Sequence, residues 1–285
     1  MRQIRQPGPP ASERVIAIEA SGRAFSFMLE RGLTFLEAVR RGFAQAGFAS
    51  GVLNCSGGAL GPLAYVMPAL STTGDNAAFY SQTFRPAGVT CLETAAMTFG
   101  TRDGAPFFHC HALWREADGR RNGGHILPDE TIVAQQFEVQ AMGIDGAGFL
   151  AETDAETNFK LFGPVVHPHG TAEAPARIFA LRLRPNQDFC TALEDFCRAR
   201  GISRARLHGG VGSIIGARFA DGRISEPFAT EIAVTAGVVA PDAKRELCAD
   251  VDIALVDYTG GIATGRLRRG DNPVLMTMEL VLEAL

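Results

Sequence analysis

The chain has 285 residues, of which 46% are hydrophobic and 20% charged, a composition ordinary for a globular protein with one large domain or two of usual size. No apolar run approaches the roughly 18 residues of a membrane-spanning helix. The net charge is −4, and no basic stripe of the kind that binds nucleic-acid phosphates is evident. We therefore expect neither a membrane protein nor one that binds DNA tightly.

The N-terminal sequence and the cysteines indicate a compartment. The first 20 residues contain Arg and Pro but no apolar stretch, so we expect a flexible tail and lead-in over residues 1–20 rather than a secretory signal. Six cysteines are scattered without a C-x-x-C pair, which indicates reduced thiols in a chain of this length. A cytoplasmic protein is the resulting expectation.

The chain contains an internal repeat. The segments that begin at Arg23 and Arg177 align without a gap, at an offset of 154 residues. In each segment a strand-like stretch precedes a good N-cap residue, and apolar residues then recur about every four positions. A glycine suited to a helix C-terminus follows in both. The pattern predicts helices over residues 34–47 and 188–201.

The last parts of the two copies also repeat, because Glu138 aligns with Glu279 at an offset of 141 residues. Between these anchors the second copy is shorter and loses part of region 66–90. Each copy contains a strand, a helix and several short strands separated by turns. This order predicts an α+β fold, with two tandem copies of an antiparallel β-sheet domain and one main packed helix each. The expected domains are residues 21–165 and residues 177–285, joined by a linker at residues 166–176.

Three of the six histidines form a candidate metal site. His109 and His111 are separated by one residue on an expected strand, so both side chains lie on one face. A turn near Asp118-Gly119 would place His125 opposite His111, on the same face. Three imidazoles with open positions are typical of a catalytic zinc ion rather than a closed structural site. We therefore predict that zinc, or another divalent metal, binds to His109, His111 and His125.

Other interpretations of the histidines stay open. The same three side chains could be hydrogen-bonded within a subunit interface. His167 and His169 repeat the H-x-H spacing but lie in the expected linker, where exposure to solvent is the simpler interpretation. His208 aligns with Asn54 of the first copy and is therefore specific to the second.

The second copy lacks the candidate metal site. The sequence DIALVD takes the place of HCHALW, so that Ala254 occupies the position of His111. Arg266 stands where His125 stands in the first copy. We expect the second copy to provide packing, or side chains that complete the pocket of the first.

Residues 23–164 resemble the plant-and-prokaryote-conserved (PPC) domain. The resemblance rests on the opening strand and capped helix, the Gly-rich NCSGGALG, the strand around Glu93, the closing ETDAETNFKLF, and above all HCHA followed by NGGH. Residues 177–285 resemble the same domain weakly, in the helix and the last strand.

The resemblance implies an antiparallel sheet with one main helix and zinc as the expected metal on the three histidines. It also implies a homo-oligomer, trimeric for single-domain members; for this chain a dimer or a trimer is open. The fold is similar to that of acetolactate decarboxylase, which also holds zinc with three histidines. Many prokaryotic members carry a DNA-binding label, and plant members bind A·T-rich DNA through an added AT-hook. This chain lacks the R-G-R-P-like core of that hook.

Two classes of function follow. The first is a zinc-dependent lyase or hydrolase whose small-molecule ligand could be a carboxylate or keto acid. Glu93 is then the candidate acid or base, and Arg102 and Arg266 are candidate anion clamps, with surface ion pairing as the alternative for each. Cys55 could face the same pocket or be a buried inert thiol. The second class is a non-catalytic ligand-sensing or DNA-associated module in which the metal is structural.

Overall fold

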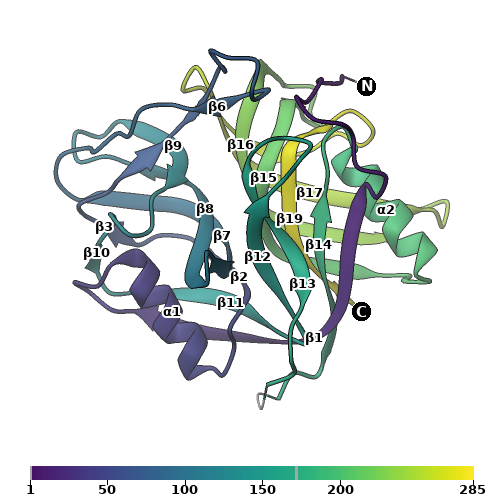
Figure 1. Ribbon diagram of the computed structural model, residues 1–285, viewed down its shortest axis with the longest axis horizontal. Helices are drawn as coiled ribbons and strands as arrows, with labels where there is room; N and C mark the ends of the chain where they lie inside the picture. The colour runs from purple at the N-terminus through teal and green to yellow at the C-terminus, as the bar shows by residue number, and fades with distance from the viewer. Residues whose placement is uncertain (1, 171–172) are drawn as a thin grey trace.

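The computed structural model describes residues 2–170 and 173–285, which form a mostly antiparallel sheet with two helices, α1 (Phe35–Gln45) and α2 (Phe189–Ala199) (Figure 1). This architecture agrees with the expected α+β class. The first half of the chain contains β1 (Val15–Leu29), β2 (Gly51–Cys55), β3 (Ala59–Leu60), β4 (Tyr65–Val66), β5 (Pro68–Ala69), β6 (Phe79–Tyr80), β7 (Thr90–Arg102), β8 (Ala105–Arg115), β9 (Arg121–Ile126), β10 (Val133–Gln135), β11 (Phe137–Asp145), β12 (Ala147–Thr153) and β13 (Lys160–Val166). The second half contains β14 (Ala176–Leu183), β15 (Ala205–Arg218), β16 (Ile224–Pro241), β17 (Leu247–Asp257), β18 (Ile262–Arg266) and β19 (Val274–Ala284).

Both helices begin where the sequence predicts them. The Thr34 side chain accepts a hydrogen bond from the Glu37 amide, and the Asp188 side chain accepts one from the Thr191 amide. Each bond satisfies an amide that the first turn of a helix leaves free. Gly47 and Gly201 follow the helices with positive φ angles of 84° and 65°, which glycine adopts without strain. The two helices are therefore confirmed, one turn or less shorter than expected.

The two halves share the same strand register. Met28 lies opposite Glu138 where β1 pairs with β11, and Arg182 lies opposite Glu279 where β14 pairs with β19. These partners are separated by the same 154 and 141 residues as in the sequence alignment. The pairings of β2 with β11 and of β15 with β19 show the same two offsets. The halves thus contain one arrangement of strands twice.

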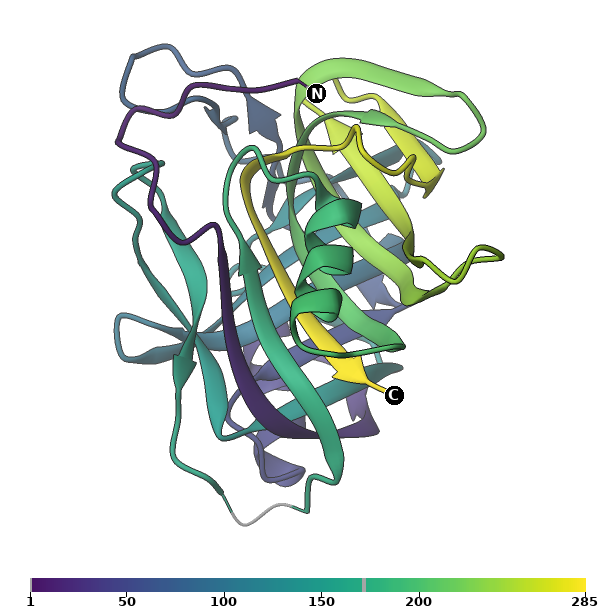
Figure 2. The same cartoon turned by 90° about the vertical axis from the view of Figure 1, so that its right-hand side faces the viewer.

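Each half has its own core, with its helix on the outside. The apolar face of α1 packs on β1 and β8, and that of α2 packs on β17 and β16, forming two large clusters of buried side chains. Figure 2 shows α2 across the outer face of the second-half strands. The opposite sheet faces pack against each other through smaller clusters that mix residues of both halves, such as Leu113 with Ala254. This shared interior places side chains of the second half next to strands of the first.

A segment specific to the first half crosses to the second. Leu53 lies opposite Met97, whereas its counterpart Leu207 lies opposite Gly237, so the offset falls from 154 to 140 residues. The first half therefore has 14 more residues here, as expected from the shorter second copy. We call residues 67–84, which include β5 and β6, the crossing segment. It runs along the top of the molecule in Figure 1, and Ala78 packs against apolar side chains of β15, β16 and β19.

The expected flexible tail over residues 1–20 is instead bound to the rest of the molecule. Residues 15–20 belong to β1 and pair with β14 of the second half. Before them, the Ile4 amide donates to Asn186 Oδ1 at 2.9 Å, and Gln6 Nε2 donates to the Leu275 carbonyl at 2.6 Å. The N-terminal segment therefore connects the halves, because β1 pairs with β14 at its start and with β11 at its end.

The expected linker lies between β13, which ends at Val166, and β14, which begins at Ala176. Residues 171–172 of that linker are outside the described residues. Within residues 2–170 and 173–285, neither helix is long and apolar enough to cross a membrane.

A buried ion-pair network joins the end of β12 to β14. Asp154 accepts from Arg182 at 2.9 Å and from Arg184 at 2.6 Å, and Arg182 is 5% exposed. Burial by itself raises the pKa of Asp154, but the two guanidinium groups outweigh it and lower that pKa below its usual value. A buried arginine that lost this partner would carry an uncompensated charge.

We therefore predict that Asp154→Asn lowers the free energy of unfolding by roughly 3–5 kcal/mol at pH 7, measured by urea denaturation. Because the folded pKa of Asp154 is depressed, the difference from wild type should shrink as the pH falls below the unfolded-state pKa of about 3.9. Asp195→Asn, at an exposed pair on α2, is the control and should change stability by less than about 1 kcal/mol. A difference that stayed constant from pH 7 to pH 3 would contradict the assignment.

Candidate metal centre

The three predicted histidines converge on one point of the β8–β9 hairpin. His111 lies directly opposite His125, as the turn position predicts, and His109 is two residues earlier on β8. The ligand atoms of the three side chains lie within 4.8 Å of one another, so they could hold a metal ion. Gly124 allows β9 to approach β4, because a Cβ there would lie 2.5 Å from the Val66 carbonyl oxygen.

Hydrogen bonds hold two of the imidazoles in one orientation. Glu279 Oε2 lies 3.0 Å from His109 Nδ1, and the Ile232 carbonyl oxygen lies 2.9 Å from His111 Nδ1. When each Nδ1–H donates to these acceptors, the Nε2 atoms remain as ligands. The two Nε2 atoms are 3.0 Å apart, close to the roughly 3.4 Å between neighbouring nitrogen ligands of a tetrahedral zinc ion.

The protonation of the site also suits a metal. Burial lowers the pKa of His111 and of His125 well below the usual 6.5, and the neighbouring His109 adds to the effect. Both rings are therefore neutral at physiological pH, which is the ligating form. His125 Nδ1 is buried and has no hydrogen-bond partner among the described residues. A bound cation would give this orphaned nitrogen the partner that it lacks, so the residues present fit a divalent metal ion.

Two buried carboxyl groups of the second half approach the histidines. Glu279 on β19 is fully buried, and Glu231 on β16 is 5% exposed with its Oε1 3.8 Å from His111 Nε2. One oxygen of each carboxyl group has no hydrogen-bond partner in the described part of the chain. Burial raises the pKa of Glu231 well above its usual value. The site therefore draws on both halves of the chain.

The sequence analysis did not identify Glu231 or Glu279 as site residues. Each is a single acidic residue within an apolar strand, in FATEIAVTA and in VLMTMELVLEA. A charged side chain at such a position is rarely buried without a partner. That signal marks both as candidates, although it does not say which site they join.

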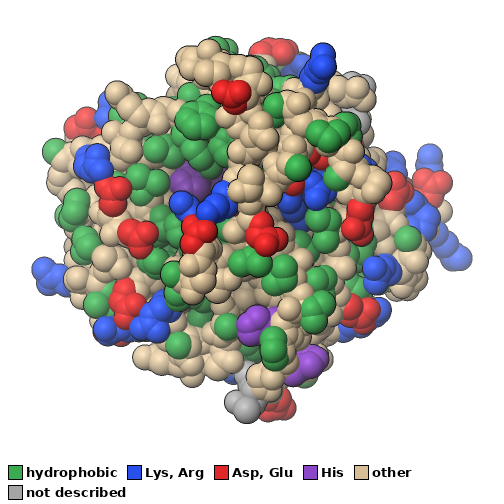
Figure 3. Space-filling model, viewed as in Figure 1, with side chains coloured by type: hydrophobic (Ala, Val, Ile, Leu, Met, Phe, Trp, Pro, Cys, Tyr) green, Lys and Arg blue, Asp and Glu red, His purple; other side chains and the backbone are tan. Residues whose placement is uncertain are grey.

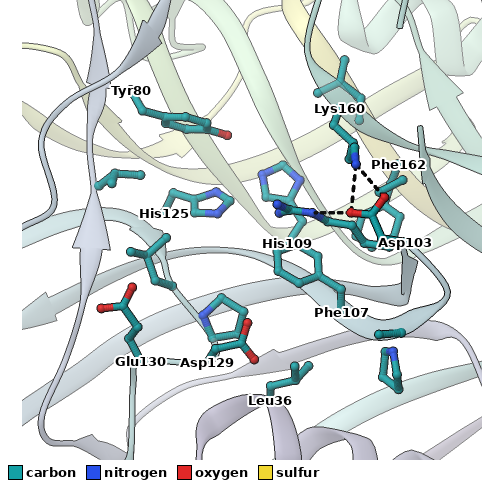
Figure 4. A pocket seen from close by; sticks show the side chains of 18 of the residues that line it. Leu36, Tyr80, Asp103, Phe107, His109, His125, Asp129, Glu130, Lys160 and Phe162 are labelled. Carbon is teal, nitrogen blue, oxygen red and sulfur yellow. Dashed lines mark hydrogen bonds and ion pairs between the residues drawn. The ribbon is translucent and has the colours of Figure 1, made fainter. Parts of the chain in front are cut away.

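An open cleft of about 940 Å³ leads to His109 and His125 (Figure 3). Arg102 lines it, as predicted for an anion clamp, and stacks over Phe107 at 4.7 Å. The Arg102 ion pair with its neighbour Asp103 is long, at 3.7 Å, while Asp103 also pairs with Lys160 at 2.6 Å. Figure 4 shows these basic groups to one side of the two histidines. The cleft thus offers positive charge beside the candidate metal centre.

Tyr80 of the crossing segment covers the same histidines. Its ring centroid lies 5.3 Å from that of His125, and Figure 4 shows it on the opposite side of the cleft from Phe107. Burial raises the pKa of Tyr80, and the nearby charges of Glu231 and Glu279 raise it further, so the phenol keeps its proton. Tyr80 was not predicted from the sequence.

Two predicted residues lie elsewhere. Glu93 is not among the residues that line the cleft, and it forms ion pairs with Arg115 and Arg121 at the distant end of the β8–β9 hairpin. Arg266 also lies outside the cleft and pairs with Asp250 and Asp252. Both therefore correspond to the surface ion-pair alternative rather than to the acid, base or clamp that the sequence suggested.

The other side chains left open by the sequence do not reach the centre. Cys55 is buried on β2, and burial raises its pKa to about 12, which fits an inert thiol. His169 is exposed and pairs with Asp145, while His208 pairs with Glu283 at 2.6 Å. His167 is exposed near the end of β13.

In the second half an ion pair replaces the histidines. Asp252 lies opposite Arg266 where β17 pairs with β18, at the position of the His111–His125 pair. The alignment that put Ala254 at the position of His111 is therefore wrong by two residues. The turns between these strands differ in length, and β16 has a bulge between Val234 and Ala236.

The second half of the chain matches a known protein family. Residues 170–285 match the Plants and Prokaryotes Conserved (PCC) domain, the family called PPC above. The chain therefore contains this domain in the half where the sequence resemblance was weak. No curated protein matches the sequence.

The chain is also similar to solved structures. A plant- and prokaryote-conserved protein of Pyrococcus horikoshii is 18% identical with a TM-score of 0.41, and the match covers 53% of this chain and 97% of that one. A metal-containing protein from Archaeoglobus fulgidus is also 18% identical, with a TM-score of 0.42 and coverage of 52% and 98%.

We predict that Glu279→Gln lowers the affinity for zinc by roughly 10–100-fold, because it weakens the acceptor that orients His109. His111→Ala should abolish stoichiometric binding. Competition with a chromophoric chelator measures both. Glu138→Gln is the matched control, since Glu138 holds the equivalent position in the first half but is exposed. Equal zinc affinity in wild type and His111→Ala would contradict the site.

Proposed function

We propose that the chain is a zinc-dependent enzyme, a lyase or hydrolase that acts on a small molecule. The observation that carries the proposal is the cluster of three neutral imidazoles at the inner end of an open cleft. Three histidine ligands with an accessible side are the pattern of catalytic rather than structural zinc sites. When bound there, zinc would polarise a carbonyl group or lower the pKa of water.

The protein side chains have distinct roles in this proposal. His109, His111 and His125 hold the metal, and Glu279 orients His109. Glu231 keeps its proton near neutral pH because burial raises its pKa, so it can donate that proton to a substrate and take it back. This carboxyl group replaces Glu93 as the proposed acid or base. Arg102 would bind an anionic group, such as the carboxylate of a keto acid.

We also propose that the chain arose as two tandem PPC-like copies, of which the second has lost metal binding. The common register and the two common offsets support this origin. The Asn54 amide donates to the carbonyl of His208, its counterpart at the 154-residue offset, so equivalent strands meet near a local two-fold axis. In this arrangement the second copy contributes Glu231 and Glu279 to the site of the first.

The catalytic proposal predicts turnover that depends on zinc and on Glu231. The zinc-loaded protein should convert at least one member of a panel of nitrophenyl esters and 2-oxo and 2-hydroxy carboxylates. Glu231→Gln should lower kcat by roughly 10²–10⁴-fold, and Arg102→Ala should raise KM for carboxylates. Arg266→Ala is the control for loss of an exposed arginine and should leave both unchanged. Equal turnover by zinc-free protein would contradict the proposal.

We propose further that the protein is a cytoplasmic homo-oligomer without tight DNA binding. Acidic residues outnumber basic ones by 31 to 27, and many arginines are paired with acidic side chains. Titration of duplex DNA, including an A·T-rich duplex, should show no submicromolar binding at about 150 mM salt, where the Debye length is ~8 Å. Submicromolar affinity at that salt would favour the DNA-associated module instead.

A further inference from the structure

A second, much smaller cavity of about 50 Å³ lies beside the histidines, on the side of the second half. His109 and His111 form part of its wall, so an atom bound at the metal centre would be next to it. The crossing segment supplies one side through Pro68, Ala78, Phe79 and Tyr80. The other side consists of residues of β15, β16 and β19: Gly212, Ser213, Thr230, Glu231, Leu275, Met276 and Thr277. We call this cavity the inner chamber.

The inner chamber is effectively apolar, although three hydroxyl groups line it. Ser213 Oγ accepts from the Met276 amide, and Thr230 Oγ1 both donates to the Ile214 carbonyl and accepts from the Ile214 amide. Thr277 Oγ1 accepts from Arg182 Nε at 3.2 Å. Because these hydroxyls are already bonded within the protein, they offer mainly their carbon atoms to an occupant. Glu231 is the remaining polar group, and it lies toward the histidines.

The chamber is closed by contacts between loops. Asn76 Nδ2 donates to the Thr157 carbonyl at 3.1 Å, and Asn158 Nδ2 donates to the Asp75 carbonyl at 2.9 Å. Phe79 and Phe159 also pack with ring centroids 5.6 Å apart. These contacts hold the crossing segment against the loop before β13, so that the chamber has fixed walls on both sides.

We propose that the inner chamber is a size-selecting subsite for a short apolar substituent of the substrate. An apolar cavity of about 150 Å³ holds a benzene ring in proteins, so about 50 Å³ corresponds to roughly two carbon atoms. A methyl or ethyl group next to the reacting carbonyl fits this volume, while the polar remainder of the substrate lies in the large cleft near Arg102. The inference rests on the proposed function, because it requires a substrate at the metal centre.

Alkyl hydroxamates test the subsite without knowledge of the substrate, because they bind zinc through the hydroxamate and differ only in chain length. Calorimetric titration of the zinc-loaded protein should show propionohydroxamate binding a few-fold more tightly than acetohydroxamate, since a buried methylene is worth about fourfold in affinity. Hexanohydroxamate should bind at least tenfold more weakly than propionohydroxamate. Affinity that stays level or rises with chain length would place the alkyl group in the large cleft and overturn the subsite.

Variants of the chamber wall should move this preference in opposite directions. Met276→Ala enlarges the chamber and should improve hexanohydroxamate binding at least tenfold, while Ala78→Leu narrows it and should weaken propionohydroxamate. Met142→Ala, at a buried methionine outside the chamber, is the control and should leave the order of affinities unchanged. An unchanged order in both chamber variants would refute the subsite. Binding of no hydroxamate at any length would refute the proposed function, and the subsite with it.

Discussion

The contact between His109 on β8 and Glu279 on β19 connects the two halves of the chain at the point where the candidate metal centre forms. Its 3.0 Å separation and the complete burial of Glu279 make it a strong orienting interaction. A buried carboxylate without a partner is costly, and an imidazole without a fixed orientation is a poor ligand. Each half therefore supplies what the other half needs, and the centre exists only when β19 packs behind β8.

Local features of the sequence predicted much of the fold. The N-cap residues Thr34 and Asp188 fix the helix starts, and the β8–β9 turn fixes the pairing of His111 with His125. These features are encoded within a few residues, so periodicity and turn chemistry are enough to find them. The same reasoning explains why the two long-range offsets, read from the sequence, reappear in the strand register.

What the sequence could not predict depends on contacts between the halves. Glu231 and Glu279 reach the histidines only through packing of β16 and β19 behind β8, and no spacing along the chain encodes that packing. Glu93 was chosen because it stands on the expected neighbouring strand, but its position along β7 places it beside Arg121 instead. The slip that assigned Ala254 arose because turn lengths and a bulge changed between the copies.

The difference between the halves follows from charge. In the second half Arg266 forms ion pairs with Asp250 at 3.3 Å and with Asp252 at 3.0 Å, where the first half has three neutral imidazoles. A guanidinium group already neutralises the acidic pair, so a metal ion there would have to displace a fixed cation. One centre per chain is therefore the arrangement that these side chains favour.

Anomalous diffraction at the zinc absorption edge, from crystals grown with zinc, is the most direct test of this account. The account predicts one strong peak per chain, between the imidazoles of His109, His111 and His125. No peak is expected between Asp250, Asp252 and Arg266. A peak only at the second position, or none at the histidines with zinc in excess, would contradict it.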